Sequence, residues 1–129
     1  MIDTPPRVAE VTNAVLMLAD LVIIPIGASA ADLWATGDLL DSVSEAEQQR
    51  ENFQARVLWN KYRAYTKSTQ ELTKEVKKEL PIKAMKTTLG LRVAYSDLLG
   101  EGLSGFEAKD RNAKEEVYKL TQEVMRLTR

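Results

Sequence analysis

A continuous apolar run from Leu21 to Ile26 constrains the fold of this chain more than any other feature. Valine and isoleucine make up most of the run, and such an unbroken stretch is typical of a strand buried on both faces of a parallel sheet. The wider apolar stretch, which extends to Ala31, is too short to span a bilayer and is interrupted by Pro25 and Gly27. The run therefore predicts a buried strand, and no membrane attachment is expected.

Helical and strand patterns alternate along the chain, which predicts an α/β fold with crossover connections and a mainly parallel sheet flanked by helices. Thr4 is the expected N-cap of the first helix, and Ser29 with Asp32 forms a weak capping box for the second. Residues 104–107 are expected to form a loop. Helices are expected over about 5–19, 30–48, 68–79, 93–99 and from 110 or 112 onward, and strands over about 21–26, 55–60 and 82–88.

The apolar positions of three helices predict which side chains enter the core, because residues three and four apart share one helical face. The expected core residues are Val8, Val11, Val15 and Leu18 in the first helix, Leu33, Trp34, Leu40 and Val43 in the second, and Ala113, Val117, Leu120, Val124 and Leu127 in the last. No internal repeat or linker interrupts the pattern, so residues 1–129 are expected to form one domain.

The 129 residues include neither cysteine nor histidine. This excludes disulfides, thiolate nucleophiles, zinc sites made of Cys and His, and Ser-His-Asp catalysis. Any catalysis would rest on carboxylates, Lys and Arg, hydroxyls and backbone groups.

The net charge of −1 hides a strong polarity along the chain. Residues 1–53 carry two arginines against nine acids, a balance of −7, whereas residues 54–92 carry ten basic residues against three glutamates, a balance of +7. The middle third is therefore a candidate surface for a polyanion. For Lys74, Lys77 and Lys78 the alternative is that they only solvate a helix. Lys86 is a poorer candidate, because the alternation of side chains along its expected strand does not decide which face of the strand it occupies.

Four short motifs follow one another along the chain. They are Asp3-Thr4-Pro5-Pro6 leading into a helix, Ala19 to Pro25 leading into Ser29 to Trp34, Val57 to Lys61, and Leu91 to Tyr95 followed by Leu98 to Gly102. In order and spacing they resemble the C-terminal portion of ParA-type partition ATPases, the deviant Walker P-loop group related to the cell-division protein MinD. The resemblance covers essentially the whole chain and implies a partial P-loop NTPase-like fold.

The resemblance implies a nucleotide site with ATP and Mg²⁺. Asp3 is similar to the Walker B aspartate, which holds a magnesium-bound water at the carboxyl end of a strand. Asn60 occupies the place where the family reads the adenine edge, since an amide both donates and accepts hydrogen bonds. The alternatives are that Asp3 begins a Pro-Pro turn and that Asn60 is an ordinary turn residue.

The family also binds DNA without sequence preference, which agrees with the +7 segment. The candidates share a place in or beside loops that follow strands, and they are Lys61, Arg63, Lys67 and Arg92. Tyr62 and Tyr65 interleave with three of them. Contacts of this kind go to phosphates and weaken steeply with salt. The resemblance further implies a ParB-like adaptor protein as partner, self-association or pairing with a full-length ParA-type protein, and a cytoplasmic, nucleoid-associated location. Ser29 to Trp34 resembles a segment near the family's nucleotide-dependent dimer contact, although Trp34 is expected in the core.

The Gly-rich phosphate loop of the family has no counterpart here, because no Gly-Lys-Thr or Gly-Lys-Ser occurs in the chain. Only Met1 and Ile2 precede Asp3, so the N-terminal strands of the fold are expected to be missing. We therefore expect this chain, alone, to lack ATP hydrolysis and to bind no nucleotide tightly.

Two further interpretations stay open. One is a stand-alone DNA- or partner-binding module that modulates a full-length ParA-type protein by competition. The other is an α/β domain whose charge asymmetry is incidental and whose resemblance reflects ancestry only.

Overall fold

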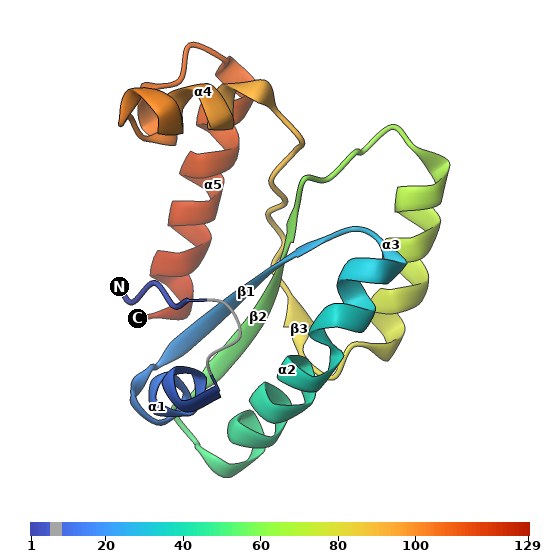
Figure 1. The fold of residues 1–129 in the computed structure, drawn as a ribbon, viewed down its shortest axis with the longest axis vertical. Helices are drawn as coiled ribbons and strands as arrows, with labels where there is room; N and C mark the ends of the chain where they lie inside the picture. Colours follow the sequence, from blue (N-terminus) through green and yellow to red (C-terminus); the bar gives the residue numbers. More distant parts are fainter. Residues whose placement is uncertain (6–8) are drawn as a thin grey trace.

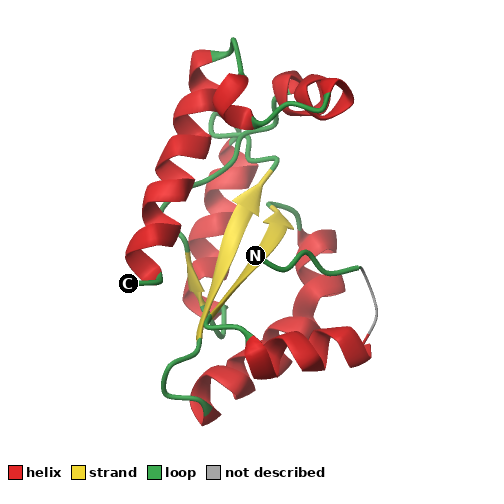
Figure 2. Cartoon of the chain, turned by 90° about the vertical axis from the view of Figure 1, so that its left-hand side faces the viewer, coloured by secondary structure: helices red, strands yellow, loops and turns green. Residues whose placement is uncertain are grey.

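The computed structural model describes residues 1–5 and 9–129 and has an α/β architecture (Figure 1). Three parallel strands lie in the order β1-β2-β3, with helices on both sides of the sheet (Figure 2). The predicted fold class, a parallel sheet flanked by helices, is confirmed and is consistent with part of a P-loop NTPase-like fold. The elements are α1 (Ala9–Leu18), β1 (Leu21–Gly27), α2 (Ala30–Gln49), β2 (Gln54–Asn60), α3 (Lys67–Glu79), β3 (Lys83–Ala84), α4 (Val93–Glu101), the 3-10 helix η1 (Gly105–Glu107) and α5 (Arg111–Leu127).

Strand β1 is an edge strand. It pairs with β2 over its full length, from Leu21 opposite Gln54 to Gly27 opposite Asn60, and no strand in the described parts of the chain pairs with its other edge. The expectation that β1 is buried on both faces is wrong, because only two of its seven residues are buried and Pro25 is exposed. Proline suits such an edge because it has no N–H to offer to a neighbouring strand.

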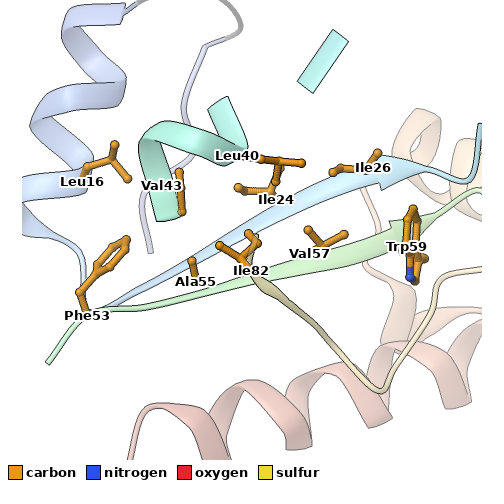
Figure 3. Close-up of a cluster of buried hydrophobic side chains, with 10 residues drawn as sticks. All are labelled: Leu16, Ile24, Ile26, Leu40, Val43, Phe53, Ala55, Val57, Trp59 and Ile82. Carbon is orange, nitrogen blue, oxygen red and sulfur yellow. The ribbon is translucent and has the colours of Figure 1, made fainter. Parts of the chain in front are cut away.

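The main core lies between the sheet and the helices that cover one of its faces (Figure 3). Alternate residues of β2 point into it, as the two-residue period of a strand requires. Ile82 adds a contact just before β3. The buried members are Leu16, Ile24, Ile26, Leu40, Val43, Phe53, Ala55, Val57, Trp59 and Ile82.

Two expected core residues are exposed. In α1, Leu16 is buried instead of Leu18, which is 74% exposed. In α2, Trp34 is 84% exposed, because it lies about 100° around the helix from Leu33, whose face Leu40 shares. The predicted start of the first helix and Val8 involve residues 6–8, which lie outside the described residues. Ser29 caps α2, since its side chain accepts the Asp32 N–H, but the predicted capping box is not complete because the Ser29 N–H donates to the Gly27 carbonyl.

The third strand is shorter than expected, two residues instead of about seven. The backbone still follows β2 beyond Ala84, since the Met85 N–H donates to the Val57 carbonyl at 2.8 Å and the Leu89 N–H to the Trp59 carbonyl at 2.9 Å. On its outer side, the Lys86 and Thr87 N–H groups donate to the carboxylate of Glu123 on α5. A helix side chain therefore takes the place of a further strand along this edge.

The last part of the chain follows its cap signals. Helix α4 ends at Gly102, whose φ of 70° lies in the left-handed region that glycine adopts without strain. The predicted loop at 104–107 is instead the 3-10 helix η1, closed by a capping box between Ser104 and Glu107. Asp110 caps α5 by accepting two backbone N–H groups. Across the described residues, no helix combines the length and apolarity needed to cross a membrane.

Candidate nucleic-acid interface

The loops that follow β2 and β3 lie side by side at the carboxyl edge of the sheet (Figure 1). Tyr62 forms a parallel bridge with Gly90, and the Tyr62 N–H donates to the Leu89 carbonyl at 2.9 Å. Ligands of open α/β sheets bind at this edge, outside the carboxyl ends of the strands. Four of the six predicted site residues follow these two strands or lie in these loops.

Asn60 ends β2 and fixes the turn that follows. Its Oδ1 accepts the N–H of Lys61 at 2.9 Å, and Lys61 adopts a left-handed φ of 52°. This contact matches the turn role considered for Asn60. Reading of an adenine edge by Asn60 stays a prediction.

Arg63 and Arg92 line one cleft of about 250 Å³, although 28 residues separate them in the chain. The cleft lies between the loop after β2 and the segment that leads into α4. Lys61 and Lys67 are exposed but do not line the cleft. The complete lining is Tyr62, Arg63, Ala64, Tyr65, Thr88, Gly90, Leu91, Arg92 and Glu116.

The two tyrosines of the loop differ in their surroundings. Tyr62 packs against the main core, and its hydroxyl lies 3.5 Å from the Thr73 hydroxyl. Tyr65 is 91% exposed. Only Tyr65 therefore presents a free aromatic face beside the cations.

Glu116 of α5 organises the inner wall of the cleft. Its Oε1 accepts from Arg92 Nε at 3.1 Å and from Nη2 at 2.6 Å, and its Oε2 accepts from the Tyr95 hydroxyl at 2.6 Å and the Gly90 N–H at 3.1 Å. Sequence reasoning missed this residue. A detectable signal was that Glu116 and Glu123 lie seven residues apart, two turns along one face of the last helix.

The ionisation of these groups is coupled. Burial disfavours the charged carboxylate of Glu116, but the hydrogen bonds from Arg92, Tyr95 and Gly90 outweigh it and lower its pKa. The same hydrogen bond raises the pKa of Arg92. Burial, together with the bond to Glu116, raises the pKa of Tyr95. At neutral pH the cleft thus contains two guanidinium groups and one carboxylate, a net charge of about +1.

The described residues do not fit a magnesium or phosphate site by themselves. Asp3 is exposed in an irregular N-terminal segment, and within residues 1–5 and 9–129 no cluster of three or more acidic residues could hold a metal. The N-terminus of α2, at the carboxyl end of β1, is filled by its own cap, since the Asp32 carboxylate accepts the Ser29 hydroxyl at 2.7 Å. The Walker B-like role of Asp3 stays a prediction.

No protein-family model matches the chain. The chain is 24% identical over 128 residues to "Maintenance of carboxysome distribution protein A" from Halothiobacillus neapolitanus. The match covers 97% of this chain and 59% of that protein, so the chain spans about three fifths of the relative's length. This similarity supports a distant relationship to a positioning protein.

Proposed function

We propose that this chain is the DNA-binding portion of a ParA-type positioning ATPase, and that it contacts phosphates through the loop after β2 and through Arg92. The observation that carries the proposal is the convergence of Arg63 and Arg92 in one cleft at the carboxyl edge of the sheet. The similarity to a protein that maintains carboxysome distribution adds support for a positioning role.

The chemistry of this surface favours phosphate contacts over base readout. Glu116 holds the Nε and Nη2 side of the Arg92 guanidinium, so the Nη1 side is the one presented to an incoming anion. Lys61, Arg63 and Lys67 are exposed and carry long flexible side chains. Such contacts position a duplex without reading its sequence.

We propose the ligands and partners of the family only for a whole ParA-type protein of which this chain is a part. They are ATP, Mg²⁺, a ParB-like adaptor and a second copy that pairs when nucleotide is bound. Asp3 and Asn60 are proposed to serve a nucleotide site that requires groups beyond those described here. The described residues alone do not form that site.

The test is binding of a fluorescent duplex of about 25 base pairs and arbitrary sequence, without nucleotide, at about 50 and 200 mM salt. The double variant Arg63→Glu with Arg92→Gln should weaken binding by about tenfold or more and lower the salt dependence, since each lost phosphate contact removes about one unit of slope. The matched control, Lys77→Glu with Lys78→Gln on the exposed face of α3, makes the same change in charge and should cost far less.

Equal losses in both double variants would show a general charge effect and contradict the assigned surface. Unchanged binding in the Arg63 and Arg92 variant would reject it outright. Thermal melting of each variant controls for folding, because Arg92 also supports Glu116.

A second candidate is a stand-alone module that competes with a full-length ParA-type protein for DNA. It is favoured by the fact that all four proposed DNA contacts lie in this chain. It predicts that an excess of this chain displaces a full-length relative from DNA, and that the Arg63 and Arg92 variant does not.

A further inference from the structure

A second cationic surface lies away from the cleft, along α5. It is a groove of about 510 Å³ between α5 and the segment after β3, here called the α5 groove. Four of its lining residues are exposed cations, and the full lining is Lys86, Thr87, Tyr118, Lys119, Gln122, Glu123, Arg126 and Arg129.

The acidic residue inside the α5 groove is already engaged. Glu123 accepts the Lys86 N–H at 2.8 Å, the Thr87 N–H at 2.9 Å and the Thr87 hydroxyl at 2.7 Å. Lys119 pairs with Glu115 at 2.6 Å, but both side chains are more than half exposed, and such surface pairs contribute little. The groove therefore presents an excess of positive charge to solvent.

Helix α2 carries the complementary pattern on its exposed face. Trp34, Asp38, Asp41 and Glu45 are spaced four, three and four residues apart, so they form one stripe, here called the α2 stripe. All four are exposed, and α2 contains neither lysine nor arginine. Asp38 and Asp41 form no ion pair with any described residue, whereas Glu47, on another face, binds the Ala55 N–H and Arg56.

The α2 stripe and the α5 groove cannot meet within one molecule, because α2 and α5 lie on opposite sides of the sheet (Figures 2 and 3). Their lengths are similar: Trp34 and Glu45 are eleven positions apart on α2, roughly 16 Å, and the groove residues of α5 run from Tyr118 to Arg126, eight positions or roughly 12 Å, with Arg129 just beyond the end of the helix. An exposed tryptophan at the end of an acidic stripe also suits an interface anchor, since Trp is enriched among residues that dominate binding energy.

We propose that the α2 stripe of one copy docks in the α5 groove of a second copy. Carboxylates of the stripe pair with the groove cations, and Trp34 packs against the half-exposed ring of Tyr118 at the groove rim. A docked pair keeps one free stripe, on one copy, and one free groove, on the other, so the contact is head-to-tail and extends to rings or chains of copies. This contact uses neither Arg63 nor Arg92 and does not depend on the proposed DNA binding.

Charge reversal with rescue tests the contact, with association of the 129-residue chain measured by sedimentation at rising concentration. The groove variant is Lys119→Glu with Arg126→Glu, and the stripe variant is Asp38→Lys with Asp41→Lys. Each should weaken self-association by at least about tenfold, because close charge pairs turn from attraction to repulsion. The chain that carries all four changes, and an equal mixture of the two double variants, should both regain association.

The variant Lys77→Glu with Lys78→Glu makes the same change in charge as the groove variant on the exposed face of α3, outside the groove, so it serves as the matched control and should associate like the parent chain. About 0.5 M salt should dissociate the parent, since it screens exposed charges within a few ångströms. The proposal is overturned if the parent chain stays monomeric, or if neither double variant weakens association, as expected of a contact through the edge of β1. It is also overturned if association is lost in the double variants and neither the fourfold variant nor the mixture restores it. A groove variant that loses DNA affinity but associates normally would also overturn it and assign the groove to nucleic acid.

Discussion

The core beneath α1 and α2 and the C-terminal unit formed by α4, η1 and α5 are held in place by different kinds of contact. The first buries ten apolar side chains against the sheet, whereas the buried cluster of the second consists of Leu98, Ala108 and Ala113. The C-terminal unit is attached instead by Glu116 and Glu123, which accept backbone and side-chain donors of residues 86–92. Apolar burial is insensitive to pH, while attachment by carboxylates is not, so the two regions should respond to different perturbations.

The largest expected effect is loss of an aromatic ring from the main core. Phe53 is 2% exposed, and its ring lies 5.1 Å from the Arg50 guanidinium carbon. Phe53→Ala should lower the free energy of unfolding by about 3–5 kcal/mol, because it removes buried area and leaves a cavity. The measurement is urea unfolding followed by circular dichroism.

Phe106 in η1 provides the control, since it is nearly half exposed. Phe106→Ala should cost about 1 kcal/mol or less. Equal losses at the two positions would erase the proposed difference between the regions.

Acid should weaken the attachment of the C-terminal unit. Burial opposes the ionisation of Glu123, but the hydrogen bonds from Lys86 and Thr87 outweigh it and lower the pKa of this carboxyl group. The hydrogen bonds to Glu116 lower its pKa in the same way. A carboxylate whose pKa is lower in the folded state stabilises the fold. This contribution is complete at pH values above the unfolded-state pKa of about 4.3, and it is lost as the pH falls through the folded-state pKa. Each carboxylate is expected to contribute about 1–3 kcal/mol, the usual cost of leaving buried partners unsatisfied.

Amide hydrogen exchange at Lys86, Thr87 and Gly90 measures this effect directly. Protection at these amides should fall between about pH 6 and pH 3.5 after correction for intrinsic exchange, while protection in β2 stays constant. The variant Glu116→Gln with Glu123→Gln should lose protection at both pH values and abolish the difference between them. Parallel loss in β2 would mean that the sheet depends on these carboxylates as well.

The smallest expected effect concerns the packing of η1 on α5. A Cβ built on Gly105 would lie 2.4 Å from the Val117 Cγ2, so Gly105→Ala forces η1 away from α5 at a cost of about 1–3 kcal/mol. Gly100→Ala is the matched control, because nothing lies within 4 Å of its Cβ and alanine favours the helix by about 0.5–1 kcal/mol. The pair is compared by thermal unfolding, and restoration of stability by Val117→Ala in the Gly105 variant would identify the contact.

Local signals in the sequence were sufficient for most of the fold. The apolar runs predicted β1 and β2, and cap residues such as Ser29 and Asp110 predicted the starts of α2 and α5 within a residue or two. These features depend on neighbours in the chain, which a sequence displays directly. The predicted burial of β1 on both faces failed because the burial of a strand depends on the segments that pack over its faces, and these lie far from it in the sequence.

Long-range contacts explain the other differences. The third strand is shorter than predicted, and beyond it the Thr87 N–H donates to Glu123, 36 residues away along the chain. Arg92 was predicted as a DNA-contacting cation beside a loop, and the structure adds that Glu116 holds one side of its guanidinium. Neither pairing has a local signature in the sequence. Arg63 and Arg92 were expected in or beside loops that follow strands, but the cleft that they share was not predicted.

The two tryptophans occupy opposite extremes, since Trp59 is 4% exposed in the main core and Trp34 is 84% exposed on α2. The indole fluorescence of the chain therefore has two spectrally separable components, a blue-shifted one shielded from a soluble quencher and a red-shifted one open to it. Replacing either residue by phenylalanine isolates the other signal. Loss of folding and burial of the outer face of α2 can thus be followed separately in one unlabelled sample.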